Sequence, residues 1–273
     1  NYEKALAHNT HNIEATYKLA ALSLAIGDIK SSLEYCDYCL QLNPLCQNAL
    51  AYKALACWVD GNRKGWEELY DFDEMIKQFH LDLPGGFSSI DDFNNTLDVD
   101  INNHKSLIWE PLERVTNGGA VTSDLLLEPT RAIRLLEKSI KQTVNNLIQN
   151  MPTNNEHPFF RTRPKNYKIT LIGSILKGHG IHPPHIHENS WLSGVYYVRT
   201  PDVMNHSDDS HSGWLQFGRP DITLQDENLL PVAVRFPQPG SLIIFPSYFF
   251  HGTIPFRSDG VRVGIAFDIY PVN

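Results

Sequence analysis

The chain has 273 residues and a formal net charge of −8, and 42% of its residues are apolar while 20% are charged. This composition is typical of a globular protein with a sizeable core, and at roughly 100–200 residues per domain it predicts one large or two modest domains. The acidic balance argues against nucleic acid as a partner, and no apolar run approaches the roughly 18 residues of a membrane-spanning helix, so we expect neither nucleic acid nor membrane as a partner.

The first part of the chain has a helical pattern that repeats. Asn12 can cap a helix from Ile13 to about Ile26, which ends at Gly27. A second helix is predicted from about Ile29 to Leu42, before Asn43-Pro44. A shift of 34 residues aligns three pairs of small residues: Ala15 with Ala49, Ala20 with Ala54, and Gly27 with Gly61.

This 34-residue helix–turn–helix period, with small residues in the first helix and Gly in the turn, resembles the tetratricopeptide repeat. The resemblance covers residues 1–78, and the chain starts inside a repeat, so we expect a fragment from which part of the repeat array is missing. It implies a groove for a peptide or protein. Plain helical packing against the next domain, without a ligand, is the alternative.

The four cysteines all lie in this helical part, at Cys36, Cys39, Cys46 and Cys57. Cys36-x-x-Cys39 looks like half of a zinc site, but the second pair is missing. We therefore expect buried, unpaired small side chains rather than a disulfide framework, and a reducing cytoplasmic location.

The rest of the chain changes from helical to strand patterns. A short helix is expected from Asp91 to about Leu97, and Glu128-Pro129 opens a helix that runs to Asn150 with Pro in its first turn. Six strands are predicted: Tyr167–Leu176, Trp191–Arg199, Gly213–Phe217, Val232–Phe236, Gly240–Phe245 and Val261–Tyr270. Because no helix separates them, they predict an antiparallel sandwich or barrel, for which a jelly roll is the natural double-sheet solution.

Histidines supply the first functional clue. Of the 12 histidines, four fall within nine residues, at His179, His182, His185 and His187. On an extended segment His185 and His187 point to the same face, so both imidazoles can chelate one metal ion. We expect His179 to be a bystander. In the polar segment 201–212, which could form a lid, His206 and His211 are expected to be solvated.

A late strand carries an arginine on an unusually open face. Alternation along Val261–Asp268 places Arg262, Gly264, Ala266 and Asp268 on one side. An arginine beside Gly and Ala faces a space rather than a filled core, and it can hold a carboxylate by a two-pronged hydrogen bond. A salt bridge, for example to Asp268, is the alternative.

Together these segments resemble the 2-oxoglutarate- and Fe(II)-dependent dioxygenases of the prolyl-hydroxylase-like superfamily, and in particular the oxygenase family often fused behind tetratricopeptide repeats. The resembling stretches occur in the family's order: GIHPPHIH at 180–187, WLSGVYYV at 191–198, GWLQFG at 213–218, FPSYFFHGT at 245–253 and RVGIAFD at 262–268. The resemblance implies an α+β fold, in which the helical repeats precede a double-stranded β-helix (jelly-roll) domain at 79–273. Residues 79–165 would supply supporting helices and loops, and residues 166–273 the core strands.

The same resemblance implies the residues of the site. His185 would be the proximal ligand of Fe(II), His251 the distal ligand, and Arg262 the anchor of 2-oxoglutarate. Tyr197 and Ser193 would add hydroxyls to the anchored carboxylate. Oxygen would be the second cosubstrate.

One position departs from the superfamily's pattern. His187 stands where an aspartate ligand is usual, and the facial triad normally consists of two histidines and one carboxylate. The third ligand is therefore His187, the adjacent Glu188 or water, and three histidines would also suit zinc. His182 and Thr253, together with Glu188, are candidates for contacts beside the ligands.

These observations favour a 2-oxoglutarate- and Fe(II)-dependent dioxygenase that hydroxylates a side chain of a peptide or protein. Two alternatives stay open on the sequence alone. One is a cupin-like metal enzyme that does not use 2-oxoglutarate. The other is a non-enzymatic interaction module with a degenerate jelly roll. The sequence does not indicate an oligomeric state.

Overall fold

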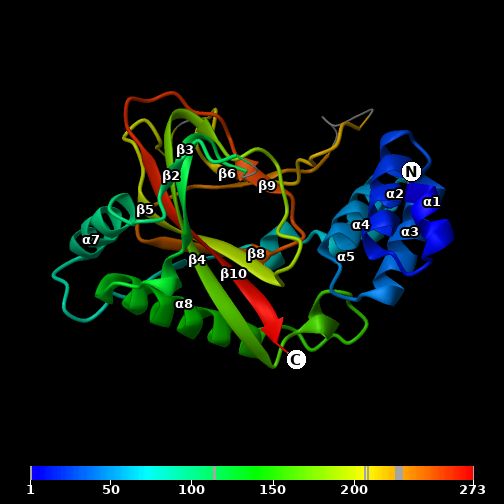
Figure 1. The fold of residues 1–273 in the computed structure, drawn as a ribbon, viewed down its shortest axis with the longest axis horizontal. Helices are drawn as coiled ribbons and strands as arrows, with labels where there is room; N and C mark the ends of the chain where they lie inside the picture. Colours follow the sequence, from blue (N-terminus) through cyan, green and yellow to red (C-terminus); the bar gives the residue numbers. More distant parts are fainter. Residues whose placement is uncertain (1, 113–114, 206, 208, 225–229, 273) are drawn as a thin grey trace.

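A helical part and a β-sheet part lie side by side in the computed structural model of the chain (Figure 1). The structure describes residues 2–112, 115–205, 207, 209–224 and 230–272. His206, within the segment for which a lid is expected, lies outside these residues. No helix in the described ranges combines the length and apolarity that a membrane span needs.

The helical part consists of short antiparallel helices at one end of the molecule. Its elements are α1 (Tyr2–His8), α2 (Ile13–Ala25), α3 (Ile29–Leu42), α4 (Gln47–Val59), α5 (Arg63–Leu69) and α6 (Phe72–Met75). Asn12 caps α2 as predicted, because its Oδ1 accepts a hydrogen bond from the backbone N of Ala15 at 2.9 Å. The starts of α2 and α4, and those of α3 and α5, are each 34 residues apart (47 − 13 and 63 − 29). All four cysteines are buried and free, as expected.

The β part contains two antiparallel sheets in the described residues. The strands are β1 (Lys77–His80), β2 (Ile108–Trp109), β3 (Asn117–Asp124), β4 (Asn166–Ile181), β5 (Leu192–Arg199), β6 (Leu215–Phe217), β7 (Ala233–Arg235), β8 (Ser241–Pro246), β9 (His251–Thr253) and β10 (Arg262–Val272). The larger sheet has the order β1-β8-β5-β10-β4-β3-β2, and the smaller one has the order β7-β6-β9. The rings of Phe217 and Phe245, one from each sheet, lie 4.9 Å apart, so the sheets face each other across an aromatic core.

Helices α7 (Ile90–Asn102) and α8 (Arg131–Asn150) support the larger sheet (Figure 1). One face of α8 is buried, and its residues recur with the 3.6-residue period of a helix: Ala132, Ile133, Leu136, Ile140 and Val144. The expected start at Glu128-Pro129 is wrong by about one turn, because Thr130 caps the helix through a hydrogen bond from the backbone N of Ile133 to its hydroxyl.

Several strands escape prediction because their pairing is long-range. Strand β3 has the glycine-rich sequence NGGAVTSD, and it forms only by pairing with β2 and β4. Strand β4 continues five residues beyond the predicted end at Leu176, through Gly178 and Gly180, to Ile181. Strand β9 has only three residues.

Tyrosines join the helical part to the strand segment that leads into the site. The hydroxyl of Tyr70 donates to the carbonyl of Tyr248 at 2.9 Å and accepts from the backbone N of Phe250 at 3.0 Å. In return the hydroxyl of Tyr248 donates to the carbonyl of Leu69. The ring of Tyr70 stacks on Phe249 at 4.3 Å. The helical part thus fixes the backbone just before His251.

Tyr70→Phe tests this connection. The change leaves the buried N–H of Phe250 and the carbonyl of Tyr248 without their partner, so we expect a loss of about 1–3 kcal/mol in the free energy of unfolding. Urea denaturation measures it. Tyr38→Phe removes an exposed hydroxyl that donates to the carbonyl of Thr10, and should change stability by less than about 0.5 kcal/mol. Equal effects of both variants would contradict the role of Tyr70.

Candidate active site

Two segments far apart in the chain bring three histidines together: His185 and His187 between β4 and β5, and His251 in β9. His185 and His251 form an antiparallel bridge, with both N–O distances at 3.0 Å. The backbone N of His187 donates to the carbonyl of Ser247 at 3.0 Å. Gly252 permits this close approach, because a Cβ there would lie 2.7 Å from the carbonyl of His182.

Hydrogen bonds orient all three rings the same way. The Nδ1 of His185 contacts the carbonyl of Pro183 at 2.8 Å, and the Nδ1 of His251 contacts the carbonyl of Phe249 at 2.9 Å. The Nδ1 of His187 lies 2.6 Å from Oδ1 of Asp268. Since each Nδ1 faces an acceptor, it carries the proton, and each Nε2 presents a lone pair.

These lone pairs converge. One ligand atom from each of His185, His187 and His251 lies within 4.8 Å of the others, and the Nε2 atoms of His185 and His187 are 3.3 Å apart. Two lone pairs this close repel unless a proton or a cation lies between them. The donor set therefore fits a transition-metal ion that prefers imidazole, such as Fe(II).

Burial favours the neutral imidazole of His185 and His251 by lowering the pKa of each. Desolvation, helped by the neighbouring His187, lowers the pKa of His185 to about 4. Desolvation, followed by the charges of His185 and His187, holds the pKa of His251 well below its usual value. Metal ligation requires the neutral imidazole, so both side chains are ready to bind at neutral pH.

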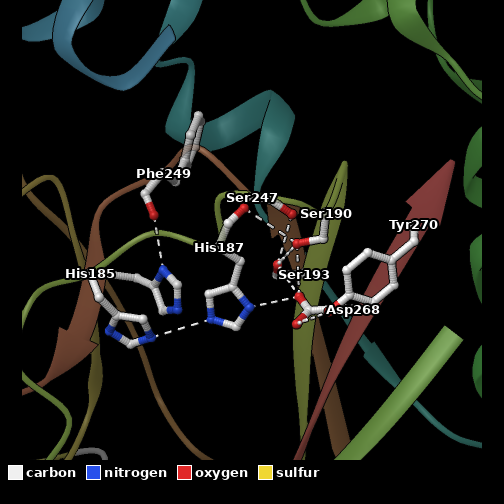
Figure 2. Close-up of polar contacts among 9 residues, drawn as sticks. His185, His187, Ser190, Ser193, Ser247, Phe249, Asp268 and Tyr270 are labelled. Carbon is white, nitrogen blue, oxygen red and sulfur yellow. Dashed lines mark hydrogen bonds and ion pairs between the residues drawn. The ribbon is translucent and has the colours of Figure 1, made fainter. Parts of the chain in front are cut away.

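Asp268, which the sequence suggested only as a salt-bridge partner of Arg262, instead contacts His187 (Figure 2). Its Oδ1 also accepts from the hydroxyls of Ser193 at 2.6 Å and Ser190 at 3.0 Å. Burial would raise the pKa of Asp268, but the charge of His187 and the hydrogen bonds from His187, Ser193 and Ser190 together hold it below its usual value. The carboxylate is therefore ionised.

Arg262 begins β10 and lies on the same face of that strand as Asp268. Its Nη2 donates to the hydroxyl of Tyr197 at 3.1 Å, and its Nε is buried without a partner. Within the described ranges no carboxylate forms an ion pair with it, and only 4% of the residue is exposed. The open-face interpretation of the sequence is thus consistent with the contacts, and the salt bridge to Asp268 is wrong.

One cavity of about 360 Å³ connects Arg262 with the three histidines. It is lined by the three histidines and by His182, Glu188, Thr253, Asp268 and Arg262. Gly264 and Ala266 form the wall between Arg262 and Asp268. The cavity is large enough for a small ligand that reaches from the guanidinium toward the three Nε2 atoms.

Two further candidate site residues, Ser193 and Glu188, do not make the contacts expected of them. Ser193 pairs with Asp268 in the β5–β10 ladder, and its hydroxyl contacts that carboxylate, so the expectation that Ser193 adds its hydroxyl to the carboxylate anchored by Arg262 is corrected. Glu188 is exposed and does not belong to the three-histidine cluster. Its charge acts instead on Tyr17, whose pKa is raised to about 12 by burial first and Glu188 second.

His182 lies beside the ligands but has its own partners. Its Nε2 is 3.1 Å from the hydroxyls of both Ser174 and Thr116, and its Nδ1 is 3.5 Å from that of Thr253. Burial, and then the charge of Arg262, hold the pKa of His182 well below its usual value. His179, the expected bystander, is exposed.

Metal uptake tests the cluster. We expect one divalent ion, probed with Mn(II) or Co(II), per chain, and at least about a tenfold weaker affinity in His251→Ala, because one of three ligands is lost. Isothermal titration measures both. His179→Asn, which tolerates the positive φ of 78° at that position, should bind as the unchanged chain does. Equal affinity in all three proteins would contradict the site.

Neutral buried histidines also make stability depend on pH. The unfolded state takes up protons near pH 6.5, whereas the folded state resists them, so the free energy of unfolding of the metal-free chain should fall as pH drops below about 6.5. Each such histidine contributes a slope of up to roughly 1.4 kcal/mol per pH unit. Urea denaturation at pH 7.5 and 5.5 should show this, and His182→Gln should reduce the slope. His11→Gln, at an exposed position, should not. A slope unchanged by His182→Gln would refute the assignment.

Comparison with known proteins agrees with this geometry. Residues 173–268 match the family described as "Putative 2OG-Fe(II) oxygenase". No curated protein matches the chain by sequence. Among solved structures, a prolyl-4-hydroxylase from Pseudomonas putida is similar at 14% identity and a TM-score of 0.49, over 73% of this chain and 94% of that one.

Two further structures show the same degree of likeness. A prolyl hydroxylase from Trichoplax adhaerens has 16% identity and a TM-score of 0.48, over 72% of this chain and 84% of its own. HygX from Streptomyces hygroscopicus, solved with nickel and 2-oxoglutarate, has 11% identity and a TM-score of 0.48, over 76% and 87%. At these values the likenesses carry no argument about activity, ligands or substrate.

The family match decides between the alternatives that the sequence left open. It spans the three histidines, Asp268 and Arg262, and it sets aside both a cupin-like enzyme without 2-oxoglutarate and a non-enzymatic module. Residues 173–268 therefore match the 2-oxoglutarate- and Fe(II)-dependent oxygenases, and together with the three converging histidines this supports an enzyme with Fe(II) as cofactor and 2-oxoglutarate as cosubstrate.

Proposed function

We propose that the chain hydroxylates a side chain of a peptide or protein, with His185, His187 and His251 holding Fe(II) and Arg262 binding the distal carboxylate of 2-oxoglutarate. One observation carries this proposal. A buried arginine without an anionic partner and three converging imidazoles lie at the two ends of one cavity.

Arg262 is suited to a carboxylate that comes from a ligand. Burying a guanidinium without a counter-charge costs free energy, and its Nε has no partner within the chain. A carboxylate would restore that hydrogen bond and neutralise the charge. Tyr197 holds Nη2 in place, and its ring lies 4.9 Å from the guanidinium carbon, so the arginine is already oriented before the ligand binds.

The chain's own residues position and shield the reactants. Bound Fe(II), with 2-oxoglutarate and oxygen, supplies the oxidation of a C–H group to an alcohol, while 2-oxoglutarate is converted to succinate and CO₂. Arg262 fixes the cosubstrate's register along the cavity, and the histidines fix the opposite end. Leu215 and Phe245 line the wall and exclude water.

The size of the cavity favours a substrate that inserts only a small group. At about 360 Å³ it lies near the lower end of the roughly 300–1,000 Å³ of small-molecule sites, and 2-oxoglutarate takes up part of it. The rest of the substrate must then lie outside, beside the exposed Glu188 and Asn189 at the rim.

The helical part lies next to this rim. Tyr52 of α4 donates to Asp221 at 3.3 Å, and Glu188 acts electrostatically on both Tyr52 and Tyr17 of α2. This proximity, with the 34-residue spacing of helix starts, supports tetratricopeptide-like repeats that hold a peptide near the cavity. A cytoplasmic location stays a prediction from the free cysteines.

Turnover of 2-oxoglutarate tests the proposal. With Fe(II) and oxygen, the chain should form succinate, and a peptide library should stimulate this more than free amino acids do. Arg262→Gln should raise the 2-oxoglutarate concentration needed for half-maximal rate by about 10–100-fold, because a hydrogen-bonded ion pair worth roughly 1.5–3 kcal/mol is lost.

Arg199→Gln is the matched control. Arg199 lies at the end of β5 and pairs with Asp98 at 3.2 Å, outside the cavity, so its loss should leave the 2-oxoglutarate requirement unchanged. Absence of succinate with every peptide pool, or an unchanged requirement in Arg262→Gln, would contradict the proposal.

A further inference from the structure

The three histidines differ in the charge of the group that holds them. His185 and His251 face neutral backbone carbonyls, those of Pro183 and Phe249. His187 alone faces a carboxylate, at 2.6 Å from Oδ1 of Asp268. His187 is also the residue that stands where the superfamily's carboxylate ligand is expected.

The groups around Asp268 are hydrogen-bond donors, which stabilise a negative charge (Figure 2). Besides His187, the hydroxyls of Ser193 and Ser190 point to Oδ1, and that of Tyr270 reaches Oδ2 at 3.3 Å. Ser193 is held in turn by the hydroxyl of Ser247 at 2.7 Å. Every one of these groups can donate a hydrogen bond and the residue is 7% exposed, so the network favours the ionised form of Asp268.

Arg262 does not pair with the carboxylate of Asp268. Both residues share one face of β10, but they are six positions apart, which corresponds to about 20 Å along a strand. The cation and the anion therefore stay available at opposite ends of the cavity. Asp268 serves the histidine end.

We propose that Asp268 supplies the negative charge of the metal centre from outside the ligand set, as a positioning residue that acts through His187. A carboxylate on Nδ1–H fixes the tautomer, aims the Nε2 lone pair at the metal and makes the imidazole a stronger donor. The negative charge that a ligating aspartate would bring to the ion is thus separated from the ion by the imidazole ring of His187. This inference rests on the proposed role of the three histidines as ligands.

Co(II) affinity, measured without 2-oxoglutarate, tests the proposal by a double-mutant cycle. Asp268→Asn should weaken Co(II) binding by about 10–100-fold. In the His187→Ala background the same change should cause no further loss, because the residue through which Asp268 acts is gone. Asp98→Asn makes the same chemical change in an ion pair outside the cavity and should leave the affinity unaltered.

Each outcome separates the possibilities. An equal loss in both backgrounds would show that Asp268 only supports the fold, and no loss in a folded Asp268→Asn would also overturn the proposal. If Asp268→Asn does not fold, Ser193→Ala removes one hydrogen bond to Oδ1 and should weaken binding by about fivefold, again only when His187 is present. Failure of the unchanged chain to bind Co(II) would instead overturn the ligand set itself. If the effect of Asp268→Asn on Co(II) affinity depends on His187 but the chain does not turn over 2-oxoglutarate, this inference is upheld and only the proposed function is contradicted.

Discussion

The site depends on the antiparallel bridge between His185 and His251. Two backbone hydrogen bonds of 3.0 Å join segments that are 66 residues apart (251 − 185). They place two imidazoles side by side, and the hydrogen bond from His187 to Ser247 adds the third. Because the backbone itself is paired, the converging Nε2 atoms are held without a bound ion, and the entropy of assembling the ligands is lost on folding rather than on metal binding.

The helical part strengthens the same segment from behind. The hydroxyl of Tyr70 donates to the carbonyl of Tyr248, and the hydroxyl of Tyr248 donates to the carbonyl of Leu69. The hydroxyl of Tyr70 also accepts from the backbone N of Phe250, the residue before His251. A change in how the helices pack would therefore reach the metal ligands through one stretch of backbone. This stretch therefore connects the helical part physically to the three histidines of the cavity.

Strand β10 gives the cavity its polarity. Period-two alternation puts Arg262 and Asp268 on the same face, with Gly264 and Ala266 between them, so one strand carries a cation at one end of the cavity and an anion beside His187. The small side chains of Gly264 and Ala266 leave open space between the two charges. The two charges are separated by the rise of the strand, which prevents them from neutralising each other.

Local rules determined much of this from the sequence alone. Capping by Asn12, the 3.6-residue period of α8 and the alternation on β10 are all short-range patterns. Such patterns predicted α2, α3, most of α8, six of the strands and the face that carries Arg262. Only the tertiary structure decided the partners. Ser193 lies by Asp268 because of the β5–β10 register, and Asp268 contacts His187 across 81 residues. Sequence periodicity fixes the face on which a side chain lies, but the ladder register and the loop path decide what it meets there.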